Sequence, residues 1–199
     1  MSSSNLGKTV SELRNHPGLP WVSLALMLLV TAVQLRMQGR LWIAASGKIL
    51  PWVSDTFSAE NSQHVLDPYS FSHLQHGLFF FFLLLPLFPR LTWSWRFFLS
   101  ATLEAGWEVL ENSAFIIERY RNETAAFGYT GDSILNSMSD VACCSAGFAL
   151  AYLLGAKRTL VLFFLIEAAM IASIKDSLLL NVIMLIHPFQ AIKDWQLGV

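Results

Sequence analysis

The feature that most constrains the fold of this chain is a series of long apolar segments separated by polar connections. The segment GLFFFFLLLPLFP, for example, contains no charged residue. Such segments are typical of helices that cross a lipid bilayer, where every backbone polar group must be bonded within the helix. We therefore predict an all-α fold, a polytopic membrane helix bundle with about five transmembrane helices. The expected spans are residues 19–35, 73–89, 95–117, 133–154 and 158–174.

The composition indicates a lipid bilayer as the main partner and bounds the domain organisation. Hydrophobic residues make up 54% of the chain and charged residues 14%, against about 25% charged in ordinary soluble domains. The net charge is −1, so no basic excess indicates nucleic acid as a partner. We expect a polar N-terminal tail at 1–18, a single transmembrane bundle at 19–187 and an interfacial C-terminal tail at 188–199. Lys175 and Asp176 interrupt the last apolar stretch, which favours a bent or interfacial segment at 178–187.

Three glutamates lie at helical spacing in the third expected span. Glu104, Glu108 and Glu111 recur at intervals of four and three, and therefore share one face of a helix. A charged side chain at the bilayer centre costs about 2.5–3.5 kcal/mol on insertion scales, so this face should meet protein, water or a cation. For any single one of these glutamates, a structural role, protonated or paired and joining two helices, is as good an explanation as a functional one. Three in register favour a functional role.

A second polar stripe opens the fourth expected span. Asp132, Asn136 and Asp140 follow one another at intervals of four, again on one helix face. Asp132 could simply cap the helix and interact with its dipole. That interpretation does not account for Asn136 and Asp140, which lie one and two turns deeper.

Two histidines open the second expected span. His73 and His76 are three residues apart, so both imidazoles could bind one metal ion, and His64 lies just upstream. Histidines at this depth are also often solvated or bonded to the backbone. A mixed set of imidazoles and carboxylates suits a divalent cation such as zinc or manganese. The candidate metal ligands are His73, His76, His64 and Asp132.

The alternation of spans across the bilayer brings these clusters together. The start of the second span, the end of the third and the start of the fourth must lie on the same side of the membrane. The connection RYRNETAAFGYTG crosses the same region and supplies Arg119, Arg121 and Tyr129 as candidate substrate-binding residues, because guanidinium groups hold phosphate or carboxylate head groups. Positive charge in the short connections favours a cytoplasmic N-terminus, which makes the polar face periplasmic in a bacterial inner membrane.

These groups favour a membrane-embedded, divalent-metal-dependent enzyme that acts on a lipid or lipid-linked substrate. A carboxylate that does not bind the metal could act as a general base toward a metal-activated water. The candidate catalytic residues are Glu108, Glu111, Asp140 and Asn136. One alternative is a small proton- or cation-coupled transporter in which the stripes form a relay. Another is a structural or accessory membrane subunit whose buried acids pair with a partner.

Several stretches carry a resemblance to a known family. They are SQHVLDPYSFSHLQHG, the segment from Glu104 to Arg121, FGYTGDSILNSMSD, and the closing KDSLLLNVIML with IKDWQ. In them the chain resembles uncharacterised protein family 0314, also called domain of unknown function 2585, which contains bacterial multi-pass membrane proteins. The resemblance implies a cell-membrane location and no established activity. The order of His, Glu and Gly-Asp motifs is more distantly similar to VanZ-like and YjdF-like membrane proteins, although Ser72 stands where the YjdF-like pattern has Asp.

Overall fold

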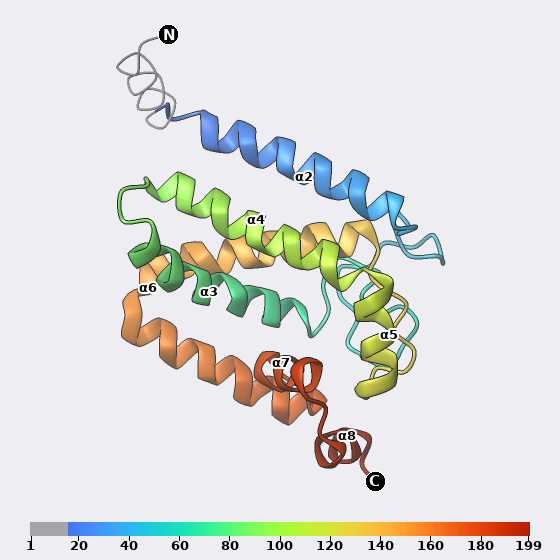
Figure 1. Cartoon of the computed structure of the whole chain (residues 1–199). Coiled ribbons are helices and arrows are strands. Elements are labelled where there is room, and N and C mark those ends of the chain that lie inside the picture. The colour runs from blue at the N-terminus through green and yellow to red at the C-terminus, as the bar shows by residue number, and fades with distance from the viewer. Residues whose placement is uncertain (1–15) are drawn as a thin grey trace.

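The computed structural model describes residues 16–199, and in this part of the chain all regular structure is helical (Figure 1). The all-α fold expected from the sequence is confirmed. Most of the expected N-terminal tail, residues 1–15, lies outside the described residues. The helices are α2 (Leu19–Met37), α3 (Ser70–Leu87), α4 (Trp93–Glu111), α5 (Ala114–Glu123), α6 (Ile134–Ile174), α7 (Leu178–Ile186) and α8 (Gln190–Leu197).

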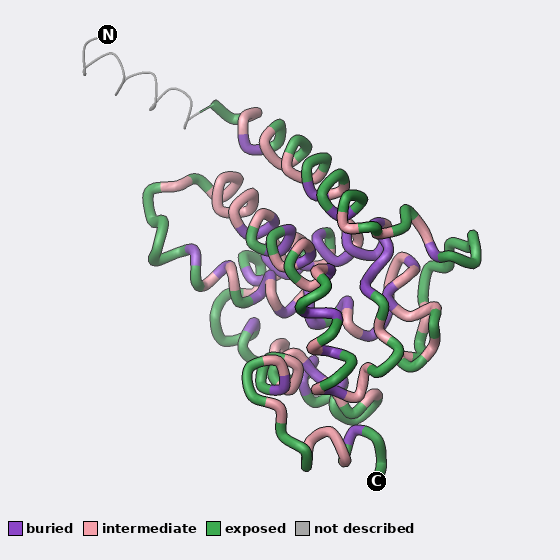
Figure 2. Tube along the Cα trace, turned by 45° about the vertical axis from the view of Figure 1, so that its right-hand side comes forward, coloured by how far each residue is buried: buried purple, intermediate pink, exposed green. Residues whose placement is uncertain are grey.

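Three of these helices, α2, α3 and α6, are long and apolar enough to cross a membrane. Figure 2 shows that much of α2 is exposed, whereas the buried segments gather where α3, α4 and α6 meet. On α2 the exposed side chains from Trp21 to Val33 are apolar, with Leu29 62% and Val30 66% exposed. A continuous apolar face of this kind is stable against lipid acyl chains. The helices therefore fit the bilayer environment that the composition indicates.

Helix α6 consists of two helical limbs, because the backbone at Gly155 is not helical. At Gly155 φ is 70° and ψ is 170°, a conformation that glycine adopts without a steric penalty. The chain reverses direction between the two limbs of α6, as Figure 1 shows. The first limb, 134–154, and the second limb, 156–174, both pack against α3.

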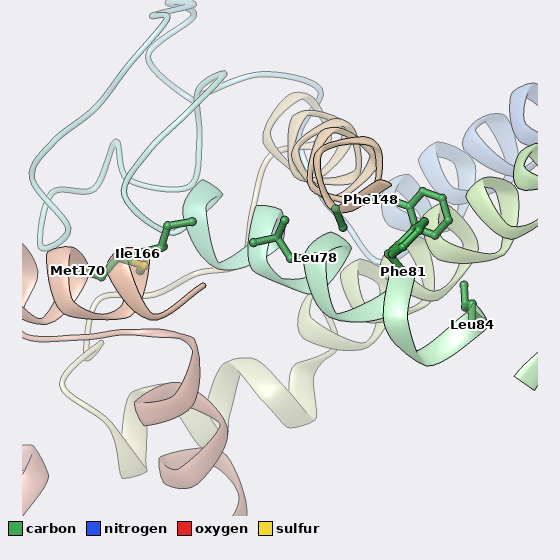
Figure 3. Close-up of a cluster of buried hydrophobic side chains, with 7 residues drawn as sticks. Leu78, Phe81, Leu84, Phe148, Ile166 and Met170 are labelled. Atoms are coloured by element: carbon green, nitrogen blue, oxygen red, sulfur yellow. The ribbon is translucent and has the colours of Figure 1, made fainter. Parts of the chain in front are cut away.

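The contact between α3 and the first limb of α6 is close enough to require glycine on both helices. A Cβ atom at Gly77 would lie 1.8 Å from the carbonyl oxygen of Cys144, and one at Gly147 would lie 2.0 Å from that of Leu74. Small residues that let two backbones approach are typical of helix pairs in membranes. Apolar side chains continue this contact and extend it to the second limb (Figure 3). They are Leu78, Phe81, Leu84, Phe148, Ala151, Ile166 and Met170.

The segment expected as one helix at 95–117 consists of two. Helix α4 ends at Glu111 and α5 begins at Ala114. The Asn112 side chain donates to the carbonyl of Glu108 at 3.0 Å, and the Ser113 hydroxyl accepts an N–H from the first turn of α5. These two side chains end one helix and start the next. Helix α5 then packs against α7 and closes the end of the bundle at which the polar groups lie.

Candidate metal centre

Two histidines of α3 converge on one glutamate of α4. His73 Nδ1 lies 2.5 Å from Glu104 Oε1, and His76 Nδ1 lies 2.9 Å from Glu104 Oε2. The spacing of three residues places both imidazoles on the same face of α3, with ring centroids 5.5 Å apart. Glu104 is fully buried, and one ligand atom from each residue lies within 4.8 Å of the others. The three residues could therefore hold a metal ion.

His73 also faces two further carboxylates. Its Nδ1 lies 3.4 Å from Glu108 Oε1, and its Nε2 lies 3.9 Å from Asp140 Oδ2. The Ser70 hydroxyl donates to Asp140 Oδ1 at 3.0 Å and orients that carboxylate. Glu108 is fully buried, yet within the described residues neither of its carboxylate oxygens has a hydrogen-bond partner. A buried carboxylate that accepts no hydrogen bond is costly, so a cation beside Glu108 would be stabilising.

A third group of acids continues the cluster to the end of α4. Glu108, Glu111 and Asp132 each offer an oxygen atom within 4.8 Å of the others. Asp132 accepts hydrogen bonds from the Asn112 amide at 2.9 Å and from the Tyr129 hydroxyl at 2.9 Å. Burial raises the pKa of Asp132 to about 6, although these hydrogen bonds act in the opposite direction. The carboxylate of Asp132 is thus held in one orientation.

A cavity of about 750 Å³ adjoins the cluster. A volume of this size accommodates a small molecule or part of a lipid. Among the described residues that line it there is no Lys or Arg. Its polar side includes His73, His76, Glu111, Asp132, Asn136 and Asp140. Its apolar side includes Phe79, Phe80, Phe163, Leu178, Val182 and Leu185.

Two of the residues predicted from the sequence form bonds that hold the connection between α2 and α3. His64 Nε2 lies 2.6 Å from Glu60 Oε2, and His64 Nδ1 accepts the Leu50 N–H at 3.2 Å. The hydrogen bond with His64 lowers the pKa of Glu60. Asn136 lines the cavity, and its side chain donates to the carbonyl of His64 at 3.0 Å. The His64 side chain lies outside the metal-capable groups found among the described residues.

The two arginines predicted to bind substrate are bonded to main-chain carbonyls. Arg119 donates to the carbonyls of Leu185 and Ile186 and so joins α5 to α7. Arg121 donates to the carbonyl of Tyr129 at 2.5 Å. Neither arginine lines the cavity, whereas Tyr129 does.

Two features of the site were not assigned from the sequence. Glu104 belongs to the predicted glutamate stripe but received no role of its own, and its spacing from Glu108 is the signal that could have indicated one. On another part of the cavity lining, Tyr69 donates to Asp176 at 3.2 Å and the Asn181 amide donates to Asp176 at 3.1 Å. Burial raises the pKa of Asp176 to about 6. No local sequence pattern indicates that Tyr69 lies beside Asp176, which is 107 positions later in the chain.

The fold and the cluster define an all-helical protein whose apolar helices fit a membrane and whose interior holds a group of histidines and carboxylates. Comparison of sequences then gives its family. The model of the family described as "Protein of unknown function (DUF2585)" matches residues 35–198. The chain belongs to this family, in agreement with the resemblance of its motifs.

Curated relatives, named UPF0314 protein, are similar over nearly the whole chain. The relative from Brucella anthropi is 41% identical over 196 residues, covering 98% of this chain and 100% of the relative. The relative from Paracoccus denitrificans is 40% identical, covering 89% of this chain and 92% of the relative. The relative from Sphingopyxis alaskensis is 40% identical, covering 89% of this chain and 95% of the relative. No solved structure matches the chain.

Proposed function

We propose that this protein is a membrane-embedded enzyme that uses a divalent cation, held by His73, His76 and Glu104, to hydrolyse an ester bond of a lipid or lipid-linked substrate. The observation that carries the proposal is the convergence of both imidazoles on one fully buried carboxylate. Without a cation, two hydrogen bonds hold the same three groups together. With a cation, the two imidazole nitrogens and a carboxylate oxygen form a set of three ligands that suits zinc or manganese.

A cation held by His73, His76 and Glu104 would supply an activated water molecule beside the cavity. Asp140 lines the cavity, faces His73 and is oriented by Ser70, so it is the proposed general base. As Asp140 accepts a proton from the water, the water oxygen would form the new bond to the acyl carbon or phosphorus, and the bond to the alcohol oxygen would break. The proton that Asp140 accepts then passes to the departing oxygen.

The form of the cavity supports an amphiphilic substrate. Its polar side carries the histidines and acids, whereas aromatic and aliphatic side chains of α3, α6 and α7 form the other side. Phe79 is 55% exposed and Val182 is 43% exposed, so the apolar side of the cavity continues to the surface. An acyl chain could lie along this side with its ester group at the metal. In this proposal α2, α3, α4 and the two limbs of α6 cross a bacterial inner membrane, and the site faces the periplasm.

Metal content tests the proposal. The full-length protein, purified in detergent and freed of metal with a chelator, is loaded with zinc or manganese, and bound metal is measured by elemental analysis. We expect the wild type to retain a metal ion at this site, and His73→Ala and His76→Ala to lose it. His64→Ala is the matched control and should retain it, because His64 bonds Glu60 and Leu50 instead. Equal metal content in the wild type and in His76→Ala would refute the proposal.

A further inference from the structure

Among the described residues, the acids at the end of α4 form no ion pair with Lys or Arg, and His73, with Nδ1 3.4 Å from Glu108 Oε1, is the basic side chain beside them. Glu108, Glu111 and Asp132 come within 4.8 Å of one another, and no described Lys or Arg lines the adjoining cavity. The two arginines bonded to the connection just before Asp132 donate to main-chain carbonyls. Arg121 donates to the carbonyl of Tyr129, and Arg40 donates to the carbonyl of Thr130. Three carboxylates in this setting need either protons or a cation.

The lack of hydrogen-bond partners at Glu108 points to a ligand. The Glu108 side chain is fully buried, with an exposed fraction of 0%. Both of its carboxylate oxygens lack a hydrogen-bond partner within the described residues. Glu111 Oε2 is likewise buried without a partner. Buried carboxylates in proteins are otherwise nearly always hydrogen-bonded. Carboxylate oxygens without partners, on residues whose ligand atoms lie within 4.8 Å of one another, suit an oxygen-binding cation.

Asp132 is held as a metal-binding carboxylate usually is. The Asn112 amide and the Tyr129 hydroxyl each donate to one of its oxygens, and the Asp132 N–H donates to Asn112 Oδ1 at 2.7 Å. Outer partners of this kind fix the orientation of a ligating carboxylate and leave lone pairs free for the ion. Asn112 lies directly after α4, so the break between α4 and α5 also serves to place Asp132 beside the glutamates.

We propose that Glu108, Glu111 and Asp132 bind a second divalent cation, a hard ion such as manganese or magnesium. All three ligands are oxygen atoms, which favours such ions over zinc. Glu108 also belongs to the group with His73 and Asp140, so it lies between the second ion and the histidine site. A role of this ion in catalysis rests on the proposed function, but its binding does not. Two neighbouring cations are a known arrangement for ester hydrolysis.

The experiment loads the metal-free, full-length protein with one equivalent of zinc and then adds manganese, with free manganese measured by electron paramagnetic resonance. We expect the wild type to bind one manganese ion beyond the zinc. Glu111→Gln should weaken manganese binding by about tenfold or more and leave zinc content unchanged. His76→Ala should lose zinc and still bind manganese. Asp176→Asn, which alters an acid of the same cavity outside the cluster, is the matched control and should bind manganese as the wild type does.

Three results would overturn the inference. They are a wild type that binds zinc and no manganese, manganese binding that is unchanged in Glu111→Gln, and manganese binding that falls equally in Asp176→Asn. Asp132→Asn gives a second, independent variant, and the melting temperature of each variant shows whether it is folded. A failure of the proposed function is distinguishable, because it removes the difference in zinc between the wild type and His76→Ala.

Discussion

Replacement of Gly77 by alanine tests how the fold positions the site. The new Cβ would lie 1.8 Å from the carbonyl oxygen of Cys144, and real Cβ contacts are essentially never shorter than 3.0 Å. Helix α3 must therefore withdraw from α6 by about 1.2 Å, because the obstacle is backbone and not a movable side chain. His73 and His76 lie on α3 within one turn of Gly77, and Asp140 lies on α6. The same shift therefore separates the histidines from Asp140.

The expected loss of stability follows from two opposing effects. Overpacking costs about 1–3 kcal/mol, whereas alanine in place of a helical glycine stabilises by up to about 1 kcal/mol. Gly106→Ala is the matched control, because Gly106 is also helical and a Cβ there meets nothing within 4 Å. The two variants should differ by about 1–3 kcal/mol, or roughly 2–12 °C in melting temperature for a chain of this size.

The assay is thermal unfolding of the wild type, Gly77→Ala and Gly106→Ala in the same detergent, followed by circular dichroism, with metal content measured in parallel. Gly77→Ala should melt below both other proteins and bind less zinc. Gly106→Ala should melt at or above the wild-type temperature with normal zinc content. Coincident melting of the two variants would show that α3 and α6 do not approach as described, and the reasoning about the site would fail with it.

Three further predictions concern single side chains. Glu108→Gln should raise the free energy of unfolding of the metal-free protein by on the order of 1 kcal/mol, because it replaces a buried carboxylate that accepts no hydrogen bond. It should also reduce the stabilisation gained on adding metal, and thermal unfolding measures both effects. Burial holds the pKa of Asp176 at about 6 against an ordinary 3.8, so its contribution to stability is complete below pH 3.8 and is lost as the pH rises through 6. Asp176→Asn should therefore show a smaller fall in melting temperature between these pH values than the wild type, and an unchanged fall would contradict the assignment. Ser133→Ala should lower the free energy of unfolding, measured by thermal unfolding, by about 1–2 kcal/mol. Ser133 caps α6 by accepting the Asn136 N–H and also donates to the carbonyl of Gln63. A loss of stability well under about 0.5 kcal/mol would contradict this.

Local periodicity was sufficient for the part of the site that lies within helices. The spacing of Glu104 and Glu108 predicted a shared face, and the high cost of charge in lipid predicted that this face meets protein, water or a cation. In the structure both side chains are fully buried in the protein. His73 and His76 share a face for the same reason. The structure brings these residues together with Asp140 because α3 packs against both α4 and α6.

The positions of the site residues outside the helices depend on long-range contacts, which a local sequence pattern does not indicate. The end of α4 is fixed by Asn112, whose side chain bonds Asp132, a residue 20 positions later. His64 bonds Glu60 because the long connection turns back on itself, and the sequence does not show which way its ring points. Arg119 bonds carbonyls at the end of α7, 66 and 67 residues away. The charge of Arg119 suggested an anionic substrate as its partner, but in the structure the partners are main-chain carbonyl oxygens.

The central claim is that His73, His76 and Glu104, drawn from two neighbouring helices, form one metal site inside the bundle. The most direct measurement is an experimental structure of the zinc-loaded protein, with anomalous diffraction data collected on both sides of the zinc absorption edge. We predict an anomalous peak at about 2.0–2.2 Å from a nitrogen of each histidine and from a Glu104 oxygen. Zinc bound only at other residues, or these side chains directed outward to the acyl chains, would contradict the account.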